Sequence, residues 1–369
     1  MQDDVGWYRE GKAKFQIGNA FYRLQSQLAR DLGVLAAAVY RANVGSLKVL
    51  DAMAGCGVRS LRYHLESQAD YLWVNDSNPD VHLVLSKNLS STIAPNCYQL
   101  THFDANRVFF ECYNQQNFYD LVDVDAFGAP APYVATSLWA VAIGGLLYLT
   151  STDGRSATGH NFHGSLANYG AYARSHPAAH EQGLRLLIGT TLQLAAAKGL
   201  GIEPVFSLFN GQVYRVMVRL IAKSQLTAAH YGFLGYCRSC GNYQSIAWRQ
   251  LGKITCPHDA YPLEVSGAMW LGRLHDTHYL ERMIAIARQP DCIALMQLMQ
   301  AEAELPPYFY TLGEIGRRGK LDIPKRSHLI KILQGWGYAA STTHVNSQAI
   351  KTNATLQTCI EAARQMTER

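Results

Sequence analysis

The chain has 369 residues, of which 48% are hydrophobic and 17% charged, with eight cysteines and a formal net charge of +5. This composition excludes a disordered chain. A chain of this length with so few cysteines is not a small disulfide-stapled fold. The sequence shows no secretory signal and no run of about 18 apolar residues. We therefore expect a cytoplasmic protein of about two domains that does not span a membrane.

Residues 47–221 alternate short β-rich runs with amphipathic segments. Strands are predicted at 47–51, 71–75, 98–101, 119–124, 146–150, 204–208 and 213–220, and helices lie between most of them, as at 80–89 and 180–198. Such alternation forms a parallel, doubly wound sheet that binds ligands at the carboxyl ends of its strands. Asn210-Gly211 predicts a hairpin between the last two strands. The predicted fold is therefore α/β and Rossmann-like, mostly parallel, with an antiparallel terminal hairpin.

A change in composition near residues 223–236 marks the predicted domain boundary. Residues 1–223 form the first domain, with 1–46 as an N-terminal extension, and residues 224–369 form a smaller C-terminal α/β domain with a cysteine-rich segment at 237–259. Between positions 317 and 331 the only acid is Asp322, and the basic residues are Arg317, Arg318, Lys320, Lys325, Arg326 and Lys331. This basic segment favours a polyanionic partner. A merely solvated basic face is the alternative.

A glycine-rich turn follows the first strand of the predicted sheet. Asp51, Gly55 and Gly57 precede a helical segment that contains Arg59. Two glycines let the backbone approach a ligand at a helix N-terminus. A dinucleotide site would need a third glycine at position 60, which is Ser60. By contrast, an acid four residues before the first glycine, such as Asp51, is typical of a site that binds the amino-acid end of S-adenosylmethionine. A plain strand-to-helix turn is the alternative.

Acids also follow the next two predicted strands. Asp76 stands where it can accept hydrogen bonds from both hydroxyls of a ribose, because an ionised carboxylate accepts several at once. Asp104, followed by Ala105, is placed to accept from an exocyclic adenine amine. Each acid taken alone is more often a helix N-cap. Three acids at three successive strand ends together predict a nucleoside site.

The fourth strand ends in Asp125, followed by Phe127. In an aromatic exocyclic amine the nitrogen lone pair is delocalised into the ring, which makes the nitrogen a poor nucleophile. A carboxylate that accepts its N–H bonds makes it more reactive, and an aromatic ring can hold the base by stacking. We predict these catalytic roles for Asp125 and Phe127, with a simple turn residue as the alternative for Asp125. A base within folded RNA must be splayed out of its stack to reach them.

Longer motifs extend over almost the whole chain. They include Glu10-Gly11, Phe21-Tyr22, Asp123-Val124-Asp125, Gly267-Ala268-Met269-Trp270, Leu305-Pro306-Pro307 and Ile350-Lys351-Thr352. On these motifs the chain resembles the tRNA (guanine-26-N2)-dimethyltransferases. The resemblance implies a class I methyltransferase that transfers one or two methyl groups from S-adenosylmethionine to a guanine N2 in tRNA. It also implies a C-terminal domain that holds the tRNA, and we expect a monomer.

The same resemblance implies roles for single residues. Those that would contact S-adenosylmethionine are Arg30, Arg59, Asp76, Asp104 and Ala105, and Asp125 would be the catalytic acceptor. Two positions depart from the family pattern, since Ala126 replaces a proline and Ala29 replaces an asparagine. Loss of the proline removes some loop rigidity. A non-catalytic tRNA-binding or tRNA-folding protein with a decayed site is therefore the alternative function, and a methyltransferase for DNA amines or proteins is a third.

The cysteine-rich segment resembles part of a zinc ribbon. Cys237 and Cys240 form a Cys-x-x-Cys-Gly knuckle, and Cys256 follows at a spacing typical of zinc sites. The fourth position by spacing is Asp259, whereas His258 is chemically the better zinc ligand. We predict a structural zinc held by Cys237, Cys240, Cys256 and His258. A degenerate ribbon that folds without metal is the alternative.

Overall fold

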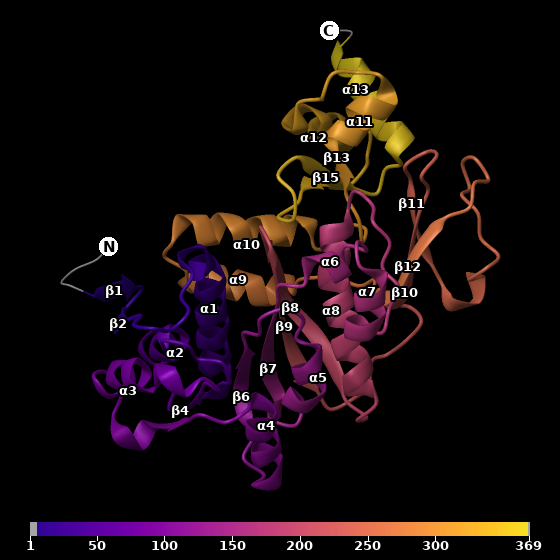
Figure 1. The fold of residues 1–369 in the computed structure, drawn as a ribbon. Coiled ribbons are helices and arrows are strands. Elements are labelled where there is room, and N and C mark those ends of the chain that lie inside the picture. Colours follow the sequence, from indigo (N-terminus) through magenta and orange to yellow (C-terminus); the bar gives the residue numbers. More distant parts are fainter. Residues whose placement is uncertain (1–5, 368–369) are drawn as a thin grey trace.

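The computed structural model describes residues 6–367 and is built around a seven-stranded sheet (Figure 1). The strand order is β5-β4-β3-β6-β7-β9-β8, and β9 alone runs against its two neighbours. The strands are β3 (Lys48–Asp51), β4 (Tyr71–Asn75), β5 (Tyr98–Thr101), β6 (Tyr119–Val124), β7 (Val141–Ser151), β8 (Gly201–Asn210) and β9 (Val213–Ile221). This topology confirms the predicted Rossmann-like sheet with its antiparallel hairpin.

Helices cover both faces of the sheet because successive strand side chains point to opposite sides. Val49 packs with one layer of helices and Leu50 with the other. The first layer holds α1 (Gln27–Val44), α2 (Val58–Ser67) and α3 (His82–Ser90), and the second holds α4 (Ala105–Asn114), α5 (Ala131–Ser137) and α8 (Ala179–Ala196). The short helices α6 (Gly154–Ala157) and α7 (Phe162–Tyr169) lie between β7 and α8 in the chain. The sheet is thus buried on both faces.

A β-hairpin, β1 (Trp7–Glu10) and β2 (Ala13–Gln16), precedes α1. The last residue of β1, Glu10, is buried and accepts hydrogen bonds from Arg30 (2.7 Å), Arg62 (2.8 Å) and Tyr22 (2.8 Å). These contacts attach the N-terminal extension to α1 and α2. They also position the segment around Tyr22 beside the carboxyl ends of the strands.

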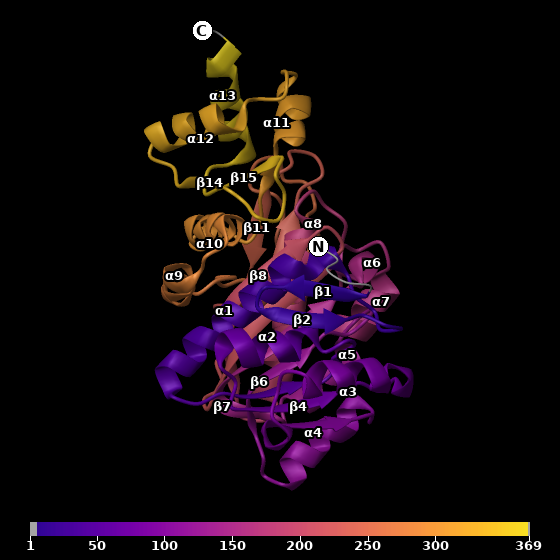
Figure 2. The same cartoon turned by 90° about the vertical axis from the view of Figure 1, so that its left-hand side faces the viewer.

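The residues after β9 form two groups of elements (Figures 1 and 2). The predicted boundary at residue 223 falls in the connection between β9 and β10. The first group is the sheet of β10 (Tyr231–Tyr236), β11 (Tyr243–Ile246) and β12 (Glu264–Trp270). The helices α9 (Thr277–Ile286) and α10 (Pro290–Glu302) follow it in the chain but pack against α1 of the first domain (Figure 1). The second group holds β13 (Tyr310–Thr311), α11 (Leu312–Gly319), α12 (Arg326–Gly335), β14 (Ala340–Thr342), β15 (Ala349–Thr352) and α13 (Leu356–Thr367). Within residues 6–367, no helix is both long enough and apolar enough to cross a membrane.

A buried ionic cluster joins these groups to the first domain. Lys351 on β15 donates to Glu181 on α8 at 2.8 Å, and Arg185 pairs with the same carboxylate at 2.7 Å. Lys351 also lies 4.0 Å from Glu302 at the end of α10. We call the junction cluster the group Glu181, Arg185, His275, Glu302, His344 and Lys351, in which both histidines face Glu302. Every side chain in it is at most 2% exposed, so it is sealed from solvent.

Candidate functional site

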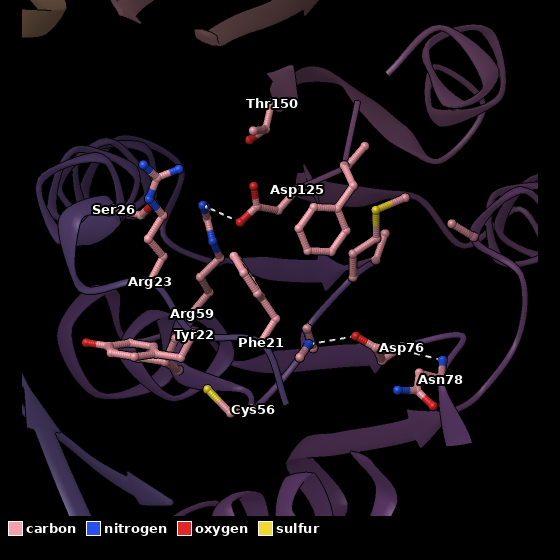
Figure 3. A pocket seen from close by; sticks show the side chains of 18 of the residues that line it. Phe21, Tyr22, Arg23, Ser26, Cys56, Arg59, Asp76, Asn78, Asp125 and Thr150 are labelled. Atoms are coloured by element: carbon pink, nitrogen blue, oxygen red, sulfur yellow. Dashed lines mark hydrogen bonds and ion pairs between the residues drawn. The ribbon is translucent and has the colours of Figure 1, made fainter. Parts of the chain in front are cut away.

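A cavity of about 580 Å³ opens at the carboxyl ends of β3, β4, β6 and β7 (Figure 3). Its wall comes from the strand ends, the turn after β3 and the segment around Phe21 and Tyr22. The sequence-predicted residues that line it are Arg30, Gly55, Arg59, Asp76, Asp104, Ala105, Asp125 and Phe127. Asp51 and Gly57 are buried behind this surface. The volume is within the usual range of about 300–1,000 Å³ for small-molecule sites.

The two glycines of the turn have different roles. Gly55 lies on the cavity wall, and its N–H donates to the Asp76 carboxylate at 2.7 Å. Gly57 has φ of +80° at the start of α2, and a Cβ there would lie 2.7 Å from a Leu85 methyl group on α3. Gly57 is therefore required by backbone conformation and by helix packing, whereas Gly55 keeps the cavity wall close to the backbone.

The acids at the strand ends lie on one side of the cavity. Asp76 accepts from the N–H groups of Gly55 and Asn78, at 2.7 and 2.9 Å. Asp104 caps α4 by accepting from the Asn106 N–H at 2.9 Å and still lines the cavity. Asp104 therefore both caps a helix and faces the cavity, because it lies in the turn between β5 and α4.

Asp51 is fully buried beneath the glycine-rich turn. One carboxylate oxygen accepts from the Ser60 hydroxyl at 2.6 Å, and the other has no hydrogen-bond partner among the described residues. Burial, with the nearby charge of Asp123, raises the pKa of Asp51 to about 7. Asp51 therefore supports the turn from below, and its raised pKa reduces its negative charge near neutral pH.

Asp125 is held by two arginines on either side. Arg59 on α2 pairs with Asp123 at 2.7 Å and with Asp125 at 2.9 Å, and Arg215 on β9 pairs with Asp125 at 3.1 Å. Burial would raise the pKa of Asp125, but Arg215 and Arg59 lower it below its usual range. The Asp125 side chain is 28% exposed. The cavity therefore contains an ionised, weakly basic carboxylate that a ligand can reach.

The loop after Asp125 remains tethered without the proline of the family pattern. Ala126 is buried, and Gly128 and Thr152 exchange two hydrogen bonds, from Gly128 N–H to Thr152 Oγ1 at 2.7 Å and from Thr152 N–H to Gly128 O at 2.8 Å. Phe127 is 72% exposed and meets Phe21 edge to face, with ring centroids 4.9 Å apart. Two aromatic rings thus stand at the rim of the cavity.

The two arginines that the family resemblance assigns to the cofactor are also engaged with the protein. Arg30 donates to Glu10 and to the Arg23 carbonyl, and Arg59 donates to Asp123 and Asp125. Sequence reasoning did not single out Arg215, which lines the cavity from near the start of β9. The available signal was a charged residue within the apolar run 213–220.

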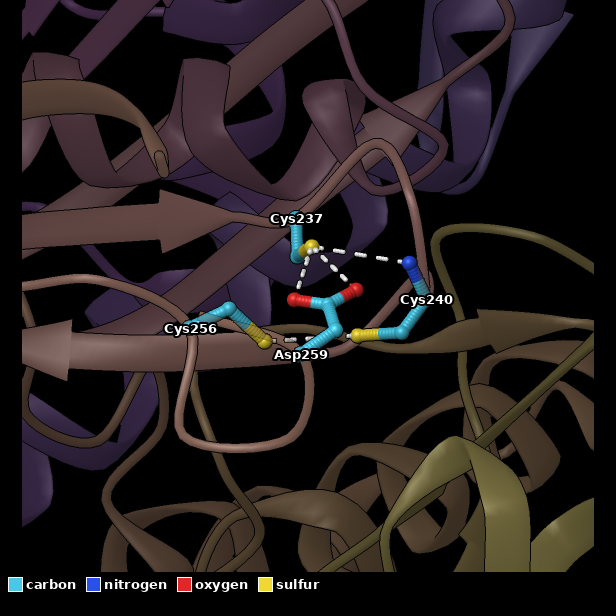
Figure 4. Close-up of side chains that lie close together, drawn as sticks. All are labelled: Cys237, Cys240, Cys256 and Asp259. Carbon is cyan, nitrogen blue, oxygen red and sulfur yellow. Dashed lines mark hydrogen bonds between the residues drawn. The ribbon is translucent and has the colours of Figure 1, made fainter. Parts of the chain in front are cut away.

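Three cysteines and an aspartate meet between β10 and β12 (Figure 4). The sulfur atoms of Cys240 and Cys256 are 3.4 Å apart, and that of Cys237 lies 3.5 Å from both carboxylate oxygens of Asp259. His258 is exposed and is not in this group. The reason is the turn at 256–260, closed by the Ala260 N–H on the Cys256 carbonyl at 2.9 Å. This turn points Asp259, three positions after Cys256, toward the sulfur atoms. In the same way, the Cys-x-x-Cys turn points Cys240, three positions after Cys237, toward them.

The sheet order and the cavity define an α/β protein of the class I methyltransferase fold. The chain matches the family model described as N2,N2-dimethylguanosine tRNA methyltransferase over residues 9–364, and it belongs to that family. It is 27% identical to a tRNA (guanine(26)-N(2))-dimethyltransferase of Pyrococcus horikoshii, covering 97% of this chain and 98% of the relative. A Schizosaccharomyces pombe enzyme of the same name is 28% identical over 85% of this chain and 62% of its own length.

A solved structure shares the fold over nearly the whole chain. It is the complex of Trm1 from Pyrococcus horikoshii with S-adenosyl-L-methionine, with a TM-score of 0.84 and 26% sequence identity. The similarity covers 97% of this chain and 99% of that one. The likeness therefore includes the C-terminal elements as well as the sheet.

Proposed function

We propose that this chain is a tRNA methyltransferase that transfers one or two methyl groups from S-adenosylmethionine to N2 of guanine 26. The observation that carries the proposal is Asp125, an ionised carboxylate that is 28% exposed beside the aromatic rim of the cavity. Family membership over residues 9–364 supports tRNA as the substrate.

The cavity suits a cationic nucleoside cofactor. S-adenosylmethionine supplies a methyl group on a positively charged sulfur. Asp76 would accept from its ribose hydroxyls, while Asp104 and Ala105 would border the adenine, with Gly55 at the turn. Beneath the cavity, three acids (Asp51, Asp123 and Asp125) face two arginines (Arg59 and Arg215). Burial raises the pKa of Asp51 to about 7, and a cation bound in the cavity would favour the ionised form of this acid.

In the proposed mechanism Asp125 accepts N–H bonds from the guanine amine and keeps its lone pair directed at the methyl group. Phe127 holds the splayed base by stacking. Because its pKa is low, Asp125 acts by orientation and charge rather than by removing a proton before transfer. The N–C bond would form as the S–C bond breaks, and the methylated amine, which is then cationic and strongly acidic, would release its proton to bulk water, leaving a neutral thioether and a neutral base.

We assign tRNA phosphate contacts to the exposed part of the basic segment. Arg317, Lys320, Lys325 and Lys331 are exposed, whereas Arg318 donates to the Ser239 and Arg238 carbonyls and so fastens α11 to the cysteine knuckle. Replacing Lys320, Lys325 and Lys331 by alanine should weaken tRNA binding and lower its salt dependence. Filter binding at several salt concentrations measures this, with Lys223→Ala as an exposed control. Unchanged affinity would reject the assignment.

We also propose a structural zinc at Cys237, Cys240, Cys256 and Asp259, in place of a set with His258. Tetrahedral zinc with Zn–S of about 2.3 Å separates neighbouring ligand atoms by about 3.5–3.8 Å, close to the observed 3.4 and 3.5 Å. Elemental analysis should find about one zinc per chain. Cys240→Ser should lose it, while Asp259→Cys and Cys97→Ser, at a distant cysteine, keep it. Equal zinc content in Cys240→Ser would contradict this site.

The function itself is tested by incubating the purified chain with unmodified tRNA and S-adenosylmethionine and analysing the nucleosides by mass spectrometry. We expect N2-methylguanosine or N2,N2-dimethylguanosine, and their ratio gives the number of transfers. If neither forms while tRNA still binds, the non-catalytic tRNA-binding alternative replaces this proposal.

A further inference from the structure

Arg215 occupies a fixed position at the cavity. It lies on β9 directly opposite Thr150 on β7, and the two strands pair along six residue positions. The residue is 4% exposed yet lines the cavity. Its Nη1 donates to Thr150 Oγ1 at 2.7 Å and pairs with Asp125 at 3.1 Å. A guanidinium on a strand that is paired on both sides is held more rigidly than one on a loop.

Arg215 retains donors that the protein does not use. A guanidinium carries five N–H groups, and among the described residues only Nη1 of Arg215 has partners. Asp125 likewise has about four lone-pair positions, of which Arg59, Arg215 and the Thr150 hydroxyl use three. A free donor and a free acceptor therefore stand side by side at the cavity.

Arg59 is the other arginine at this carboxylate, and both of its terminal nitrogens already have a protein partner, whereas Nη2 of Arg215 has none among the described residues. Nη1 of Arg59 donates to Asp123 and its Nη2 to Asp125. It also lies 5.5 Å from the Tyr148 ring centroid. Arg59 therefore holds Asp125 in place, while Arg215 both holds it and keeps donors for a ligand.

We propose that Arg215 and Asp125 together read the Watson–Crick edge of the target guanine, a proposal that rests on the function proposed above. Arg215 donates to O6, and Asp125 accepts from N1–H and N2–H. Adenine in the same position presents an amino group to Arg215 and a lone pair to Asp125, so both contacts become repulsive. The pair thus selects guanine and leaves N2 as the atom next to the methyl donor.

The test uses a tRNA made by ligation with 2,6-diaminopurine at position 26. This base keeps the 2-amino group that receives the methyl group, but it has an amine in place of O6 and a lone pair at N1. The wild-type enzyme should prefer guanine by about 100-fold or more in kcat/KM, because both polar contacts are lost. Equal methylation of the two bases by the wild-type enzyme would overturn the proposal without any variant.

The variant Arg215→Gln separates base reading from a structural role. Glutamine can accept from the 6-amino group, so the guanine-to-diaminopurine ratio should fall by about 10-fold or more, whereas Arg215→Lys should keep the guanine preference. A merely structural arginine would reduce both rates equally and leave the ratio unchanged, which would reject the proposal. Failure of the proposed function looks different, since the wild-type enzyme would then methylate neither base.

Discussion

Two of the buried ionic clusters within residues 6–367 differ in charge balance and in access. The cavity cluster (Asp51, Arg59, Asp123, Asp125 and Arg215) has three acids and two arginines, whereas the junction cluster has two acids, Arg185 and Lys351. Burial, outweighing the opposing charges, raises the pKa of Asp51 and Asp123. In the junction cluster the cationic and histidine partners outweigh burial and lower the pKa of Glu181 and Glu302.

The difference separates a site for chemistry from a structural joint. A sealed cluster must be neutral, because nothing else can compensate a charge there. A cluster that faces a cavity can contain an additional acid, because either protonation of Asp51 or a bound cation balances its charge. The cluster with the additional acid lines the proposed ligand site, whereas the balanced cluster fastens the C-terminal elements to α8.

The largest expected effect comes from breaking the balanced cluster. Lys351→Met removes the cation shared by Glu181 and Glu302, and loss of one partner from a buried ion pair costs about 3–5 kcal/mol. Thermal unfolding measures the loss, with Lys331→Met as an exposed lysine in the same group of elements. If the two variants unfold at the same temperature, the junction cluster does not hold the molecule together.

Breaking the cavity cluster should cost activity instead. Asp125→Asn removes the charge that orients the amine, and we expect methyl transfer to fall by about 100-fold or more. Initial rates on tRNA, with cofactor binding and unfolding temperature as controls, check this. An unaltered rate would show that Asp125 is only a turn residue.

The tRNA-facing lysines lie outside both clusters, so their alanine variants should change the salt dependence of tRNA binding and leave the unfolding temperature unchanged. A fall in unfolding temperature that accounts for the whole loss of binding would contradict a direct role in recognition. Arg215 belongs to the cavity cluster, and Arg215→Gln should also lower the unfolding temperature, because it removes a buried partner of Asp125. Its effect on recognition is therefore measured as the ratio of the guanine and diaminopurine rates, which a loss of stability alone does not change.

The smallest effect concerns Asp51 and depends on pH. Its folded pKa of about 7 exceeds the ordinary value of 3.8, so the folded state binds more protons, and stability falls as pH rises from about 4 to 7. Asp51→Asn removes this penalty. Its unfolding temperature should exceed that of the wild-type chain by a few degrees at pH 8 and by less at pH 5. A constant difference at both pH values would contradict the raised pKa.

Local patterns in the sequence determined the strands, the antiparallel hairpin and the positions of Asp76, Asp104 and Asp125 at strand ends. These features follow from side-chain periodicity and from turn residues within a few positions of one another. The three clustered cysteines are also visible at this level, because their spacing is local.

Only the tertiary structure decided which distant residues share a site. Strand pairing brings Arg215 of β9 to Asp125 of β6 across β7, and helix α2 delivers Arg59 to both acids. Asp51 lies beneath the cavity rather than on it, and a single turn brings Asp259 instead of His258 to the cysteines. Sequence spacing cannot supply such contacts, since they depend on strand order and on the direction in which each backbone turn points its side chains.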